Sequence, residues 1–173
     1  MGDFWQLQTA TINVVELGPS TLTMVRLGHR SNHAAVVLEQ LLGVELRAAP
    51  NAARGGFPRA ICLGPNEWLV IGVGSETIAQ SVTDRATVLA ADVSDGHYCL
   101  GVSGKQVRDL LAKGCSIDLH PGAFAVDCTA RTLFAQVPVI IDCADNELFR
   151  LWFDISYRDY VRAWFADALI EFS

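Results

Sequence analysis

The first residues that could do chemistry are a glycine and a lysine, Gly104-Lys105. In phosphate-binding loops such a pair supplies backbone N–H groups and an ammonium group to the phosphates. That motif also needs a glycine that opens the loop and a serine or threonine after the lysine to bind magnesium. Cys99 and Gln106 occupy those two positions. The pattern therefore predicts no nucleotide site here.

A second glycine-rich segment, Gly72-Val73-Gly74, has the beginning of a dinucleotide-binding fingerprint. The third glycine, which lets the helix approach its strand closely, is replaced by Thr77. Two glycines near the end of a strand are usually turn residues. We therefore predict a turn, and no cofactor bound to this chain.

Histidines 29 and 33 have the spacing of a zinc-binding helix, but Arg30-Ser31 stands where the required glutamate should be. We interpret them as polar loop histidines.

Cys115, Asp118 and His120 are close enough in sequence to suggest a metal site or a nucleophile. No third ligand and no G-x-S-x-G elbow accompanies them. We expect Asp118 and His120 to hydrogen-bond to the backbone in a turn that Pro121 closes. The sequence thus predicts no catalytic, cofactor-binding or metal-binding residue on this chain.

The elements that position these candidates are clearest in residues 92–121. Asp95-Gly96 indicates a turn, residues 98–103 alternate like a strand, and a short helix around residues 107–113 ends at Gly114.

In the first half we predict a strand at 22–27, a helix capped by Ser31 that ends at Gly43, and a surface loop at 45–59. A hairpin around Gly64-Pro65-Asn66 follows, then a helix capped by Ser75 and a strand at 87–93. The expected apolar face of the first helix consists of Ala34, Val37, Leu38, Leu41 and Leu42; that of the second includes Ile78 and Val82.

In the second half we predict strands at 131–136, 139–142 and 148–153, and a final helix capped by Ser156. That helix has an aromatic and apolar stripe: Tyr157, Tyr160, Val161, Trp164, Phe165, Ala168, Leu169 and Phe172. The stripe fits either a core or an interface with a partner, since Tyr and Trp are frequent interface anchors.

Together these elements predict an α+β fold of two fused ferredoxin-like (split β-α-β) halves, with mostly antiparallel sheets covered by helices. Residues 1–20 are expected to form an N-terminal arm or edge strand. Residues 21–173 are expected to form a single compact domain, with halves at about 21–95 and 96–173.

The composition limits the class of protein. Half of the residues, 51%, are hydrophobic and the formal net charge is −6, so a nucleic-acid partner is disfavoured. The hydrophobic excess is compatible with a well-filled core or with a surface that meets a protein partner. Five scattered cysteines suggest reduced thiols, and no segment has the length of a membrane span. We therefore expect a cytoplasmic protein without membrane contact.

Several short motifs in order resemble one known family. They are D-V-S-D-G at 92–96, L-A-K-G-C at 111–115, D-L-H-P at 118–121, C-L-G-P-N-E-W-L-V-I-G at 62–72, Ala123-Phe124 and Thr132-Leu133. The chain resembles the gamma subunit of heterotetrameric sarcosine oxidase over most of its length. It departs from the family at Asp127-Cys128, where a glycine is frequent, and at Ile155, where an arginine is frequent.

The resemblance implies a non-catalytic subunit that acts in the assembly of a flavin enzyme. Such complexes demethylate sarcosine oxidatively and pass the one-carbon unit to tetrahydrofolate or release formaldehyde. FAD, FMN and NAD are implied for the complex, on its alpha and beta chains, and the partners are the alpha, beta and delta subunits. The fold implied is that of part of a folate-binding aminomethyltransferase. Two alternatives remain: the equivalent subunit of a related N-methyl amino acid dehydrogenase, and a stand-alone folate-binding protein of the aminomethyltransferase type.

Overall fold

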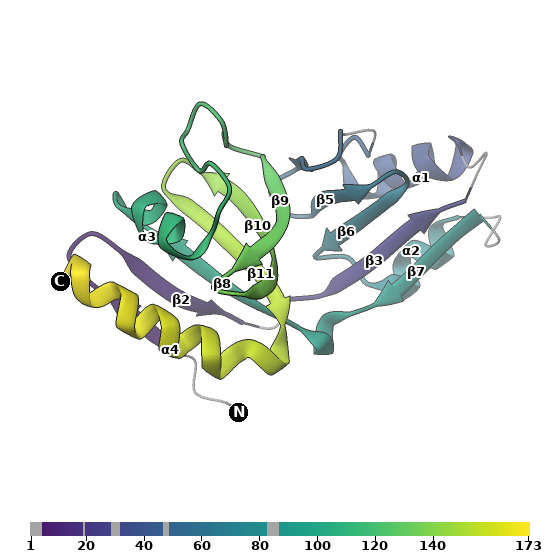
Figure 1. Cartoon of the computed structure of the whole chain (residues 1–173). Helices are drawn as coiled ribbons and strands as arrows, with labels where there is room; N and C mark the ends of the chain where they lie inside the picture. Colours follow the sequence, from purple (N-terminus) through teal and green to yellow (C-terminus); the bar gives the residue numbers. More distant parts are fainter. Residues whose placement is uncertain (1–4, 19, 29–31, 47–48, 83–86) are drawn as a thin grey trace. The chain divides into compact units, whose positions relative to one another are not determined.

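The computed structural model describes residues 5–18, 20–28, 32–46, 49–82 and 87–173 of the chain. They form two compact units: the first unit combines Met1–Pro19 with Gly96–Ser173, and the second unit is Ser20–Asp95 (Figure 1). Each unit has one antiparallel sheet and its own helices. The predicted α+β class, with antiparallel sheets covered by helices, is confirmed.

The second unit has a sheet in the order β4-β5-β6-β3-β7. Its elements are β3 Leu22–Leu27, α1 Asn32–Leu42, β4 Ala53–Arg54, β5 Arg59–Gly64, β6 Glu67–Ile71, α2 Ser75–Ser81 and β7 Val88–Asp92. Strands β3 and β5 are parallel because both pair antiparallel with β6, which lies between them. Helix α1 connects these two strands, and α2 connects β6 to β7 across β3 in the same way. This unit therefore has the split β-α-β order that the sequence predicts.

One face of this sheet packs against α1 and α2, which lie together on the same side (Figure 1). Helix α1 buries Ala34, Leu38 and Leu42, whereas Leu41 at the edge of the predicted apolar face is 37% exposed. Ile78 of α2 is fully buried in the same cluster. The 3.6-residue period of a helix thus places the core residues of both helices correctly.

Two details of the second unit differ from the prediction. The segment 45–59 is not only a surface loop, because Ala53 pairs with Ile61 in β4–β5 and Leu46 is 1% exposed. Ser75 begins α2 and does not cap it; the N-cap is Gly74, and no side chain caps the helix. The predicted cap Ser31 lies outside the described residues.

The first unit has a sheet in the order β1-β2-β8-β11-β10-β9. Its elements are β1 Gln6–Gln8, β2 Asn13–Leu17, β8 His97–Ser103, α3 Val107–Gly114, β9 Thr129–Phe134, β10 Val137–Asp145, β11 Leu148–Asp154 and α4 Arg158–Ala168. Strand β1 lies at the sheet edge, and β2 pairs with both β1 and β8. Helix α3 joins β8 to β9, which run antiparallel because β11 and β10 lie between them. This unit is therefore a variation on the split β-α-β order.

Helix α4 and α3 cover one face of this sheet. From α4, Val161, Phe165 and Ala168 enter the core, while Tyr157 and Tyr160 are 39% and 51% exposed. The aromatic and apolar stripe therefore lies partly in the core and partly on the surface.

The predicted cap of the last helix is corrected by the structure. Asp154 Oδ1 accepts hydrogen bonds from the N–H and the hydroxyl of Ser156, at 2.9 and 2.6 Å, so Asp154 caps the 3-10 turn Ile155–Tyr157 that precedes α4. An aspartate carboxylate is a stronger acceptor than a serine hydroxyl at such a position.

All five cysteines are free in the structure, as the sequence predicts: Cys62, Cys99, Cys115, Cys128 and Cys143. Among the helices in the described part of the chain, none has the length and hydropathy needed to cross a membrane.

Candidate functional site

Gly104-Lys105 lies in the turn between β8 and α3. Gly104 has φ +123°, and a Cβ at this position would lie 2.0 Å from the carbonyl oxygen of Thr11. Lys105 is exposed and borders a shallow pocket of about 300 Å³ with Glu147 and residues of the β1–β2 turn. The positive φ and the close approach of the Thr11 backbone require a glycine at this position.

Gly72 and Gly74 follow β6, where a turn is predicted. Gly72 has φ +95° and donates its N–H to the carbonyl of Thr21 at 2.8 Å. The ring of Phe57 lies against Gly72, so a Cβ there would be 2.7 Å from Phe57 Cζ. The close approach of Phe57 and the positive φ therefore require a glycine at position 72.

Asp118 and His120 are exposed in the segment after α3. Asp118 Oδ1 accepts from the N–H of His120 at 2.9 Å, and His120 Nδ1 accepts from the N–H of Gly122 at 3.1 Å. This confirms the predicted turn in which both side chains bond to the backbone. Cys115 is buried, and its thiol sulfur lies 4.0 Å from Thr132 Oγ1.

Only one histidine of the predicted pair lies in the described part of the chain. His33 is exposed on α1, while His29 lies outside the described residues. Across the described ranges, no three His, Cys, Asp or Glu side chains are grouped closely enough to hold a metal ion.

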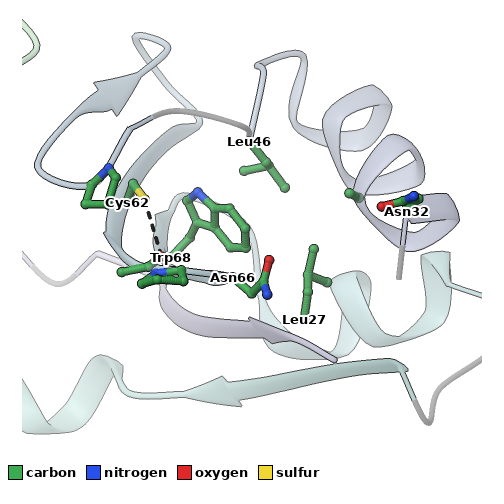
Figure 2. A pocket seen from close by; sticks show the side chains of 10 residues that line it. Leu27, Asn32, Leu46, Cys62, Asn66 and Trp68 are labelled. Atoms are coloured by element: carbon green, nitrogen blue, oxygen red, sulfur yellow. Dashed lines mark hydrogen bonds between the residues drawn. The ribbon is translucent and has the colours of Figure 1, made fainter. Parts of the chain in front are cut away.

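The second unit contains a pocket of about 310 Å³ between β5, β6 and α1 (Figure 2). Its lining is Leu27, Asn32, Ala35, Leu46, Pro50, Cys62, Gly64, Pro65, Asn66 and Trp68. Leu27, Leu46 and the indole of Trp68 supply apolar walls, and the amide of Asn66 lies near them (Figure 2).

The polar atoms of this pocket are poorly suited to catalysis. Trp68 is 5% exposed, and its Nε1 is buried without a hydrogen-bond partner among the described residues. Burial raises the pKa of the Cys62 thiol, although its hydrogen bond to the Gly64 carbonyl at 3.5 Å acts in the opposite direction. A thiol with a raised pKa is a weak nucleophile near neutral pH. Among the described residues that line the pocket, Cys62 has the only ionisable side chain.

Sequence reasoning missed Arg108, which organises the segment that carries Asp118 and His120. Its Nη1 donates to the carbonyl of Phe124 at 2.9 Å and to that of Leu119, and its guanidinium lies 4.8 Å from the centre of the Phe149 ring. One arginine thereby satisfies carbonyls in a long segment without regular structure. The residue has a structural role, and only its position on an amphipathic helix was visible in the sequence.

A second polar cluster joins β2, β8 and α4. Arg158 Nε donates to the hydroxyl oxygen of Tyr98 at 3.0 Å, and Arg158 Nη2 donates to Glu16 Oε2 at 3.2 Å. Burial and the Glu16 carboxylate raise the pKa of Tyr98 to about 12. Burial opposes ionisation of Glu16, but hydrogen bonds with Tyr98, Arg158 and the backbone N–H of Trp5 outweigh it and lower the pKa of Glu16.

This cluster leads to a prediction about pH. The stabilising contribution of Tyr98 is fully present below the ordinary tyrosine pKa of about 10 and is lost as the pH rises towards the folded pKa of about 12. The contribution of Glu16 is present above its ordinary pKa of 4.5 and is lost as the pH falls below it.

Urea unfolding across the pH range measures both effects. Tyr98→Phe should remove part of the alkaline loss, and Glu16→Gln part of the acid loss, each relative to the parent chain. Tyr160→Phe is the control, because Tyr160 donates to the Ala135 carbonyl away from the cluster. An unchanged alkaline slope in Tyr98→Phe would contradict the assignment.

Comparison with known proteins gives a consistent result. The model of the sarcosine oxidase, gamma subunit family matches residues 28–171. A sarcosine oxidase subunit gamma from Corynebacterium sp. (strain P-1) is 30% identical over 169 residues, which is 94% of this chain and 82% of the relative. One from Arthrobacter sp. is 26% identical over 148 residues, covering 83% of this chain and 72% of the relative.

Solved structures share the fold. A chain of the heterotetrameric sarcosine oxidase from Corynebacterium sp. U-96, in complex with pyrrole 2-carboxylate, superposes with a TM-score of 0.86 at 23% identity, covering 97% of this chain and 89% of that chain. The glycine cleavage system aminomethyltransferase T from Bartonella henselae gives a TM-score of 0.68 at 13% identity over 90% of this chain and 45% of that chain. At these identities the likeness concerns the fold alone.

Proposed function

This chain belongs to the sarcosine oxidase gamma subunit family, and we propose that it is the non-catalytic gamma subunit of a heterotetrameric, flavin-dependent sarcosine oxidase. The complex demethylates sarcosine oxidatively, and its one-carbon product passes to tetrahydrofolate or leaves as formaldehyde. This chain contributes to assembly with the alpha, beta and delta subunits. Its place of action is the cytoplasm.

The observation that carries the proposal is the match to relatives named as gamma subunits along nearly the whole chain, up to 94% of its length. The site geometry supports it, because Lys105, Asp118 and His120 are each exposed. Asp118 and His120 accept hydrogen bonds from backbone N–H groups of their own turn. The apolar pocket in the second unit has no group matched to acid, base or nucleophilic chemistry. Co-purification of tagged chain with the large subunits produced together with it tests the assignment.

The cofactors belong to the other chains in this proposal. FAD, FMN and NAD are held by the alpha and beta subunits, and this chain binds none of them. Its two glycine-rich turns lack complete phosphate-binding motifs: Cys99 and Gln106 replace the first glycine and the Ser/Thr of one, and Thr77 replaces the third glycine of the other. Purified chain should show no visible absorbance, and a stoichiometric flavin band that survives gel filtration would contradict this assignment.

Two alternatives are separated by direct measurements. A related N-methyl amino acid dehydrogenase would use the same kind of subunit, so turnover of the purified complex with different N-methyl amines distinguishes it. The aminomethyltransferase-like fold favours testing a stand-alone folate-binding protein as well. Saturable binding of tetrahydrofolate to the isolated chain would support that second alternative.

A non-catalytic role predicts small effects at the polar candidates. Alanine at Lys105, Asp118 or His120 should leave turnover of the reconstituted complex within about threefold, because loss of an acid or base catalyst usually costs about 10²-fold or more. Each of these side chains is exposed, so the folded chain should remain intact. Steady-state turnover is measured together with a pull-down of the large subunits. Loss of turnover in His120→Ala with normal folding and assembly would mean that this chain carries chemistry.

A further inference from the structure

Phe57 is the most exposed large apolar side chain in the described part of the protein. It is 76% exposed, compared with 69% for Ile170 and 59% for Leu89. It lies between β4 and β5, in the segment that sequence reasoning treated as an ordinary loop. Burial of a phenylalanine side chain is favourable, and a ring this exposed has most of that gain still available for binding a partner.

The ring of Phe57 packs against a glycine of the turn after β6. It lies against Gly72, whose φ of +95° and missing side chain allow the contact. A Cβ at this glycine would be 2.7 Å from Phe57 Cζ and 2.8 Å from Cε1. The contact positions the ring while leaving most of its surface open to a binding partner.

The backbone that carries the ring is also held in place. Gly55 has φ +84°, and a Cβ there would lie 2.5 Å from the carbonyl oxygen of Pro58. Arg59, which is 4% exposed, donates through Nη1 to the Gly55 carbonyl at 2.6 Å. A ring on an ordered loop loses little conformational entropy on binding, so more of its burial energy appears as affinity.

We propose that Phe57 is the anchor through which this chain docks onto a larger subunit of the complex, where it enters an apolar pocket that accepts one aromatic ring. The inference rests on the proposed function. Buried aromatic anchors of this kind commonly dominate the affinity of protein interfaces. Arg54, exposed at the start of the same loop, matches a pocket with an acidic rim.

The test compares variants in binding to the remaining subunits of the complex. Phe57→Ala should weaken the affinity by about thirtyfold or more, which corresponds to about 2 kcal/mol. Its melting temperature as a free chain should stay close to that of the parent, because the ring is 76% exposed. Leu89→Ala is the matched control: it removes another exposed apolar side chain, 59% exposed on β7, and should change the affinity less than threefold. Arg54→Gln should weaken binding by a few-fold at low salt and have no effect at high salt.

The outcomes separate this inference from the proposed function. If the parent chain binds the larger subunits and Phe57→Ala binds them equally well, the anchor is refuted while the proposed function stands. If the parent chain binds none of them, both fail. If Phe57→Ala abolishes a homodimer but leaves binding to the larger subunits unchanged, the ring serves self-association and the inference is wrong. Phe57→Leu, which keeps an apolar side chain beside Gly72, should bind with intermediate affinity.

Discussion

Replacement of Phe134 by alanine is expected to lower the free energy of unfolding by about 3–5 kcal/mol, the usual cost of truncating a fully buried phenylalanine. Phe134 ends β9 and is 0% exposed. Its ring centroid lies 4.7 Å from that of Trp164 in an edge-on arrangement and 5.3 Å from that of Phe165 in a stacked one. The cavity left by the ring would also open beside Gly114, where a Cβ would already be 2.7 Å from the ring.

Urea unfolding followed by tryptophan fluorescence measures this loss, since Trp164 is in direct contact with the ring. Leu133→Ala is the matched control, because the neighbouring side chain on β9 is 50% exposed and points to the other face of the sheet. It should cost less than about 1 kcal/mol. A loss of similar size in both variants would mean that Phe134 does not hold the core together.

Gly104→Ala is expected to destabilise the chain by about 3 kcal/mol or more. At φ +123° an L-residue is strained, and the added Cβ would lie 2.0 Å from the carbonyl oxygen of Thr11. The added Cβ would clash with backbone atoms of the β1–β2 turn, so the clash can be relieved only if that turn moves away from α3.

The matched control is Gly96→Ala, because a Cβ at Gly96 meets no atom within 4 Å. Its effect should stay within about 0.5 kcal/mol. Thermal and urea unfolding of the two variants give the comparison. If Gly104→Ala is as stable as Gly96→Ala, the glycine before Lys105 is present for a reason other than packing.

The sequence predicts most elements because their signals are local. Strand β3 is found at 22–27 as predicted, and α1 and α3 have their apolar residues at helical spacing. The hairpin of β5 and β6 is marked by Pro65-Asn66, where Asn66 has φ +60°.

Other features depend on partners that are distant in sequence. Strand β4 consists of Ala53–Arg54 and exists because it pairs with β5, and a two-residue strand has no period that could be recognised. Strands β11 and β10 likewise lie between β8 and β9 because of how the strands pair. The alternation of apolar and polar residues within one strand does not specify its neighbours in the sheet.

The candidate residues follow the same division. The incomplete fingerprint correctly identifies Gly72 as a turn residue, but the contact with Phe57 that requires a glycine there is not visible in the sequence. The same holds for the contact of Gly104 with Thr11. Arg108 and Phe57 carry no motif, since one is an arginine on an amphipathic helix and the other a phenylalanine beside two glycines. Arg108 is distinguished by its hydrogen bond to the carbonyl of Phe124, and Phe57 by its exposed ring. Both are properties of the folded chain.

The first unit is interrupted in sequence, and this has a consequence for vectorial synthesis on the ribosome. Strand β2 pairs with β1, which is also N-terminal, and with β8, where Val14 lies opposite Val102. The whole of Ser20–Asp95 is therefore translated before β8 can leave the exit tunnel. The nascent second unit has all its strands and helices by then, whereas the hairpin of β1 and β2 waits with one edge unpaired. A chaperone that protects exposed strand edges should bind the chain in this interval. We expect its preferred substrates to be arrested nascent chains that expose Ser20–Asp95 while β8 is still inside the tunnel.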